Sequence, residues 1–240
     1  MKRALFFLLG AAIGLQPITT EAQLNGAIQP VEYLDFVGGS GQGGTYGVQV
    51  GAYRGRFLAD ADVGPSVART TTSNQFAIYC VDYLHYASNS EGLVTATALG
   101  QANDLTGTNT RLQDYGRYQR SAYLASMFDS WQGHQETLGA TYGGSFSRAE
   151  VWGGLHAAIW DVATGPEGLG SGQTAVARNY FLGLATRNSE GFDTEGWYVL
   201  SDFDQSLSSS SSGQEFLMRR VSVPEPSTLL LLLSGVFVLC

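Results

Sequence analysis

Residues 147–163 carry the feature that most restricts the fold, because their pattern is that of a helix with a defined start and end. Ser147 and Glu150 have the spacing of a capping box, in which two side chains satisfy free backbone N–H groups at a helix start. The pair Gly165-Pro166 then predicts the end of the helix. Its apolar face is predicted at Val151, Leu155, Ala158, Ile159 and Val162. Such a face has to be covered by another layer of structure.

The segments around this helix predict the rest of a mixed domain. A second helix is expected after Asp114, which can cap it, through 118–128, and a third at 174–186. Short strands joined by glycine turns, or apolar aromatic stretches, are expected at 46–50, 56–59, 76–82, 196–200 and 215–218. We therefore predict a single α+β domain over 23–221, with N- and C-terminal β-strands around a central group of about three helices.

The first 22 residues have the pattern of a secretory signal peptide. Lys2 and Arg3 precede an apolar run over 4–15, and a small-residue cleavage site follows that ends at Ala22. The apolar run is too short to span a bilayer, which needs roughly 20 residues. We predict that signal peptidase removes residues 1–22 and that the chain is exported.

The charge of the chain excludes several functional classes. Its formal net charge is -8, and Lys2, within the predicted signal peptide, is the only lysine. The exported chain therefore cannot form a lysine Schiff base, a phosphate-binding loop of the Walker type or an internal Lys–Asn crosslink. Nucleic acid is not expected as a partner, because cationic side chains supply most of the affinity for phosphate.

The C-terminal residues 222–240 contain a motif of their own. Pro224, Glu225 and Pro226 form an extended stretch that is followed by an apolar run to Cys240. This arrangement resembles the PEP-CTERM sorting signal of Gram-negative bacteria. The resemblance implies recognition by an exosortase, a membrane cysteine protease that cuts near the Pro-Glu-Pro motif. It also implies transient anchoring in the inner membrane, often in species that make extracellular polysaccharide and biofilm.

The tail departs from that family in one respect. The family signal ends in a cluster of arginines on the cytoplasmic side, whereas this chain ends at Cys240. The run 229–240 is also shorter than a bilayer of about 30 Å requires. The simplest interpretation is a truncated tail.

The domain has a second resemblance, to bacterial thioester domains. Its residues are Ile78-Tyr79-Cys80-Val81-Asp82, the stretch 120–125 (Arg-Ser-Ala-Tyr-Leu-Ala) and the stretch 155–161 (Leu-His-Ala-Ala-Ile-Trp-Asp). The resemblance implies an internal thioester between the cysteine sulfur and a glutamine side chain, an electrophile that captures amines. Here His156 stands where the family has the glutamine, and an imidazole cannot form an acyl–sulfur bond.

Cys80, His156 and Asp82 are the candidate catalytic residues. If the resemblance holds, Cys80 lies near His156, and such a pair can form a thiolate–imidazolium nucleophile whose ring Asp82 or Asp161 orients. The competing interpretation is a packed histidine, because Trp152 and Trp160 lie four residues on either side of it, together with an inert buried cysteine.

Other kinds of site have weaker support. The three histidines, His85, His134 and His156, show no metal-ligand spacing, so no metal and no cofactor is expected. Aromatic residues such as Tyr115, Tyr118, Tyr123 and Trp131 could line a sugar-binding face, although core packing is the simpler interpretation of their spacing.

These observations predict a non-enzymatic, exported cell-surface or extracellular-matrix protein. Its processing partners are signal peptidase and an exosortase, its tail contacts the membrane before cleavage, and extracellular polysaccharide is a candidate partner. Two alternatives remain open. One is a surface adhesin that forms an acyl bond from Cys80 to another glutamine, and the other is a Cys–His hydrolase.

Overall fold

The computed structural model describes the middle of the chain, in eight stretches: residues 31–39, 42–45, 48–58, 76–83, 92–100, 104–165, 168–202 and 214–220. The predicted signal peptide with its cleavage residue Ala22 lies outside these residues, as do the motif residues Pro224, Glu225 and Pro226 and the histidine His85. The structure therefore describes the greater part of the predicted domain.

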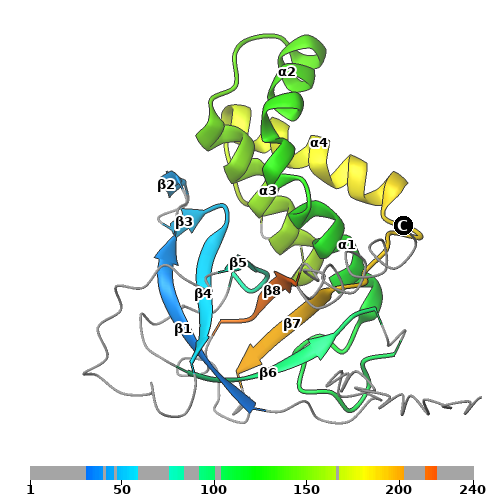
Figure 1. Ribbon diagram of the computed structural model, residues 1–240. Helices are drawn as coiled ribbons and strands as arrows, with labels where there is room; N and C mark the ends of the chain where they lie inside the picture. Colours follow the sequence, from blue (N-terminus) through cyan, green and yellow to red (C-terminus); the bar gives the residue numbers. More distant parts are fainter. Residues whose placement is uncertain are drawn as a thin grey trace, which may run out of the picture.

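Six strands in the described residues form a closed antiparallel barrel in the order β1-β4-β5-β8-β7-β6 (Figure 1). The strands are β1 (Val31–Gly39), β4 (Tyr53–Leu58), β5 (Phe76–Cys80), β6 (Gly92–Ala98), β7 (Trp197–Asp202) and β8 (Phe216–Arg219). A separate two-stranded ribbon consists of β2 (Gln42–Thr45) and β3 (Val48–Val50). Closure leaves the barrel strands paired on both sides, which removes the free edges of an open sheet.

The barrel is closed by segments from opposite ends of the domain. β1 pairs with β6, with Val31 opposite Thr95. β8 lies between β5 and β7, so that Met218 is opposite Ile78 on one side and Tyr198 on the other. Residues near both ends of the predicted domain are therefore needed for one sheet.

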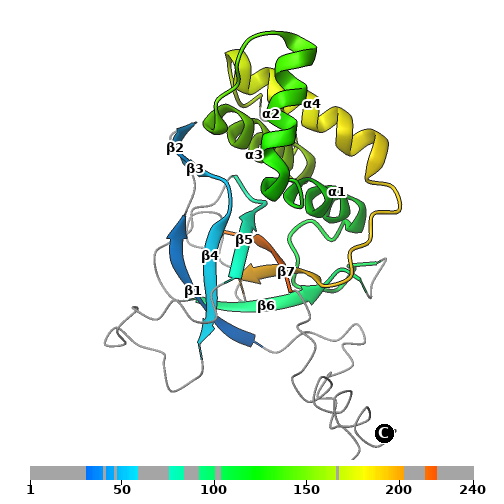
Figure 2. The same ribbon diagram turned by 45° about the horizontal axis from the view of Figure 1, so that its top comes forward.

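The helices lie together over one end of the barrel (Figures 1 and 2). They are α1 (Tyr115–Ala125), the short 3₁₀ helix η2 (Phe128–Ser130), α2 (Trp131–Tyr142), α3 (Arg148–Ala163) and α4 (Gly172–Asn188). None of these helices is long and apolar enough to cross a membrane. The α+β fold class is confirmed, and the central group holds four α-helices in the described residues where about three were expected, with α2 as the addition.

The predicted helix starts are confirmed at α1 and α3. The Asp114 side chain accepts a hydrogen bond from the backbone N–H of Arg117, at 3.1 Å. Ser147 and Glu150 form the predicted capping box, with both reciprocal hydrogen bonds present. α3 was predicted to have one apolar face, but every residue from 151 to 160 is buried, because α1, α2, α4 and the ribbon surround it.

Gly154 lets α3 and α4 approach closely. A Cβ atom at this position would lie 2.5 Å from the Cβ of Ala177 and 2.7 Å from the backbone nitrogen of Arg178. Contacts this short are repulsive, so the crossing of the two helices depends on the absence of a side chain. Gly133 in α2 differs, because a Cβ there would meet nothing within 4 Å.

These two glycines form a matched pair for measurement. Gly154→Ala should lower the free energy of unfolding by about 1–3 kcal/mol, because the added methyl forces α3 and α4 apart. Gly133→Ala should raise it by up to about 1 kcal/mol, because alanine favours a helix and meets no neighbour. Urea unfolding followed by circular dichroism measures both, and equal effects of the two substitutions would contradict the close crossing.

Candidate functional site

Cys80 is the last residue of β5 and lies beneath α3, fully buried. The indole N–H of Trp160 in α3 donates a hydrogen bond to its sulfur at 3.3 Å, and its own S–H donates to the backbone carbonyl of Asp82 at 3.3 Å. Burial raises the pKa of the Cys80 thiol to about 12. The sulfur is therefore a protonated thiol at neutral pH.

His156 links α3 to two separate parts of the barrel end. The backbone N–H of Gly51 donates to its Nδ1 at 2.8 Å, so Nδ1 carries no hydrogen. Nε2 must then carry the hydrogen, which it donates to the backbone carbonyl of Cys80 at 3.0 Å. The ring is fully buried, and burial lowers its pKa to about 4, so it is neutral at pH 7.

Aromatic rings surround the imidazole. Trp160 stacks on it, with ring centroids 4.4 Å apart and an interplanar angle of 26°. Phe128 meets it edge-on at 5.7 Å and Tyr53 at 5.9 Å. The packed histidine predicted from its spacing is therefore present, with Phe128 and Tyr53 as the further ring neighbours. Trp152, the other predicted neighbour, packs against Phe128.

This geometry does not favour nucleophilic chemistry by the pair. Both ring nitrogens of His156 bind backbone atoms, so neither is left to take a proton from the Cys80 sulfur. Burial also favours the neutral forms of both groups, which opposes a thiolate–imidazolium pair.

The two aspartates proposed to orient the ring have arginine partners. Asp82 pairs with Arg111 at 3.2 Å, and Asp161 pairs with Arg178 at 3.4 Å. The hydrogen bonds of His156 go to Gly51 and Cys80, so within the described residues neither carboxylate holds the ring. The structure brings Cys80 and His156 together, but it gives Asp82 a different role, as half of a buried ion pair.

Sequence reasoning missed Gln214, the residue two positions before β8. Its side-chain nitrogen donates to the backbone carbonyl of Asp82 at 2.8 Å, the same carbonyl that accepts from the S–H of Cys80 at 3.3 Å. The contact arises because β5 pairs with β8, where Cys80 lies opposite Phe216. No local pattern could have revealed it, since the pairing joins distant segments.

A buried carboxyl group at Glu215 was also missed. Its side chain accepts hydrogen bonds from the backbone N–H of Arg111 at 3.0 Å, from the Ser201 hydroxyl at 2.5 Å and from the Tyr118 hydroxyl. Burial raises the pKa of this carboxyl group, and the three donors partly oppose that effect. The cluster joins the segment before α1, α1 itself and β7 to the start of β8.

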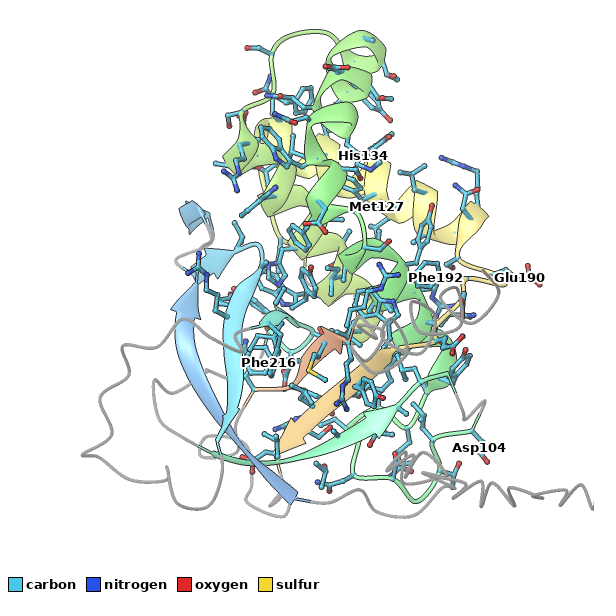
Figure 3. The ribbon with its side chains drawn as sticks, viewed as in Figure 1. Asp104, Met127, His134, Glu190, Phe192 and Phe216 are labelled. Carbon is cyan, nitrogen blue, oxygen red and sulfur yellow. The ribbon has the colours of Figure 1, made fainter. Side chains whose placement is uncertain are left out.

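The described residues contain no group of three or more His, Cys, Asp or Glu side chains placed to hold a metal ion. His134, in α2, instead shares a hydrogen bond with the hydroxyl of Tyr180 in α4 at 3.1 Å, and Figure 3 shows it on the side of α2 that faces α4.

Comparisons with protein families, with curated proteins and with solved structures found no match to this chain.

The buried imidazole makes stability depend on pH. The unfolded chain binds a proton at His156 near pH 6.5, whereas the folded chain binds it only near pH 4. Between these values the unfolded state holds more protons, so the free energy of unfolding contributed by His156 falls as the pH falls, by about 3 kcal/mol in all. Glu215, whose pKa is raised, contributes in the opposite direction, since its folded form gains a proton first on acidification.

Comparing wild type with His156→Gln isolates the first effect, because both proteins keep Glu215. Urea unfolding at pH 7 and pH 4.5 should show that wild type loses more stability on acidification than the variant. His134→Gln is the control and should keep most of the wild-type pH dependence, because His134 is only partly buried. Equal pH dependence in wild type and His156→Gln would contradict a neutral, buried His156.

Proposed function

We propose that this chain is an exported cell-surface or extracellular-matrix protein, processed by signal peptidase and an exosortase, whose domain has a structural or binding role rather than a catalytic one. The observation that carries the non-catalytic part is the state of Cys80 and His156. Both are fully buried, burial favours their neutral forms, and both nitrogens of the ring bind backbone atoms.

The export part of the proposal rests on the two ends of the sequence. The basic start, short apolar run and small-residue site at 1–22 match a secretory signal. The Pro224-Glu225-Pro226 motif before an apolar run resembles a PEP-CTERM signal. The low lysine content does not by itself indicate export; it only excludes nucleic acid as a partner.

Mass spectrometry of the protein purified from its native envelope tests export and sorting together. We expect an N-terminus at Gln23 and a C-terminus near 224–226, because both signals are then cut. A Pro224→Ala, Pro226→Ala double variant should keep the first cut and lose the second, while Pro30→Ala should change neither. Intact protein in the cytosol, with both ends uncut, would overturn the proposal.

A second candidate function is favoured by one arrangement, in which the Gln214 side chain and the Cys80 thiol both donate to the backbone carbonyl of Asp82. In this alternative the sulfur attacks the side-chain carbonyl carbon of Gln214, the carbon–nitrogen bond breaks, and ammonia leaves with the thiol proton. The product is an internal thioester, which a surface adhesin could use to capture an amine. Gln214 thus provides the glutamine side chain that a thioester requires and that His156 lacks.

Intact mass distinguishes the two candidates. The structural role predicts the unmodified mass and a Cys80 that iodoacetamide alkylates only after urea unfolding, because the thiol is buried and its pKa is high. The adhesin predicts the loss of one ammonia, abolished by Cys80→Ala and by Gln214→Ala. Peptide mapping separates Cys80 from Cys240, the other thiol of the chain.

A further inference from the structure

Arg148, in the first turn of α3, is held between two indole rings. Its guanidinium carbon lies 3.9 Å from the ring centroid of Trp152, one turn further along α3, and 5.4 Å from that of Trp131, the first residue of α2. Contacts of this kind attract a cation to the ring face and restrict the orientation of the guanidinium plane. We call Trp131, Arg148 and Trp152 the arginine–indole cluster.

The hydrogen-bond donors of this cluster have no acceptors in the described part of the chain. Arg148 is exposed and makes neither a hydrogen bond nor an ion pair there. The indole nitrogen of Trp152 is buried and has no hydrogen-bond partner either. A buried N–H without an acceptor is costly, and most such groups in folded proteins are paired with protein, water or ligand.

The sequence around the cluster keeps the arginine available. Glu150, an acidic residue two positions away, is occupied by the capping box, where its carboxylate accepts from the Ser147 backbone at 2.7 Å and from the Ser147 hydroxyl at 2.8 Å. The Trp152 indole packs directly against Gly51, where a Cβ atom would lie 2.3 Å from the ring. The guanidinium is therefore positioned by the rings and not neutralised by an acid.

We propose that the arginine–indole cluster binds a carboxylate-bearing sugar, such as a uronic acid residue of an acidic polysaccharide. A fixed guanidinium presents parallel N–H groups that match the two oxygens of a carboxylate. An indole offers an apolar face for a pyranose ring, and Trp131 is only partly buried. The proposal deepens the one above and rests on it for access to extracellular polysaccharide.

The net charge of the chain limits how an anionic ligand can be attracted to the arginine–indole cluster. A formal net charge of -8 provides no long-range attraction for an anion, so affinity has to come from short-range contacts at the cluster. A peptide rich in acidic side chains would meet the same repulsion and would make less use of the partly exposed Trp131 indole. A sugar with one carboxylate per ring fits the cluster better.

To test this proposal, trigalacturonic acid is titrated into the protein purified from its native envelope. Binding is measured by calorimetry and by tryptophan fluorescence. Wild type should bind the trimer, and Arg148→Gln should bind it at least about ten-fold more weakly, because a charge-assisted hydrogen bond is lost. Arg148→Lys should also bind more weakly, since lysine keeps the charge and loses the parallel donors. Trp131→Ala, at a partly exposed position, is a second variant that should weaken binding.

Arg187→Gln is the matched control, because it removes the same charge from an exposed arginine, in the last turn of α4. It should bind as wild type does, and circular dichroism should show that all variants are folded. The proposal is overturned if the acidic trimer does not bind, if neutral galactotriose binds as tightly, or if folded Arg148→Gln is unaffected. Equal binding of triglutamate would also overturn it and indicate an acidic peptide as the partner.

Failure of this proposal and failure of the proposed function give different results. A chain cut at both ends that does not bind the trimer overturns the binding site alone. A chain that binds the trimer but remains uncut in the cytosol overturns export and sorting alone.

Discussion

One imidazole ring connects the two layers of this fold. His156 accepts from the backbone of Gly51, between β3 and β4, and donates to the backbone of Cys80, at the end of β5. The two bonds link a helix that is buried on all sides to two places at the end of the barrel. Because both bonds are buried, losing the ring would leave a backbone donor and a backbone acceptor unsatisfied, which costs more than the bonds themselves contribute. The helical group, the ribbon and the barrel end all depend on this arrangement.

The resemblance to thioester domains suggested by the sequence would place a glutamine at this position, where the chain has His156. A histidine there cannot form the acyl bond, but its two nitrogens lie on opposite sides of a rigid ring and can bind two backbone groups at once. In this structure, the two nitrogens of the His156 ring bind two backbone groups in this way. Cys80 then contributes its backbone carbonyl to the bridge, while its sulfur receives the Trp160 indole N–H. The aromatic residues and the histidine of α3 therefore serve mainly to pack the helix against the barrel.

Local signals in the sequence predicted the elements that begin or end with distinctive residues. Asp114 and Ser147 start α1 and α3 as expected, and the apolar stretch at 76–82 contains β5. α2 was not predicted because it has little apolar pattern: Leu138 is its only fully buried residue, and Gly133 interrupts it. β6 was not predicted either, because its alternation of small residues is a weak strand signal until the neighbouring strands are known.

Some features of the candidate site were likewise expected from the sequence, and others were not. The proximity of Cys80 and His156 was expected only as an implication of the resemblance to thioester domains, whereas the positions of Gln214 and Glu215 follow from the pairing of β5 with β8. The role of Asp82 could not be predicted, because its partner Arg111 lies in an irregular segment before α1. A single sequence indicates where an apolar strand lies but not which distant strand it pairs with.

The order of strands in the barrel has a consequence for how the chain folds. β8 comes last along the described residues, yet it lies between β5 and β7 in the closed barrel, where Met218 is opposite Ile78. Pairings between such distant residues raise the contact order and slow folding, because a long loop must close before the contacts form. The sheet cannot be completed while β8 is still being synthesised or threaded. A chain of this design therefore cannot complete its barrel until the segment that contains β8, the last strand along the described residues, is available.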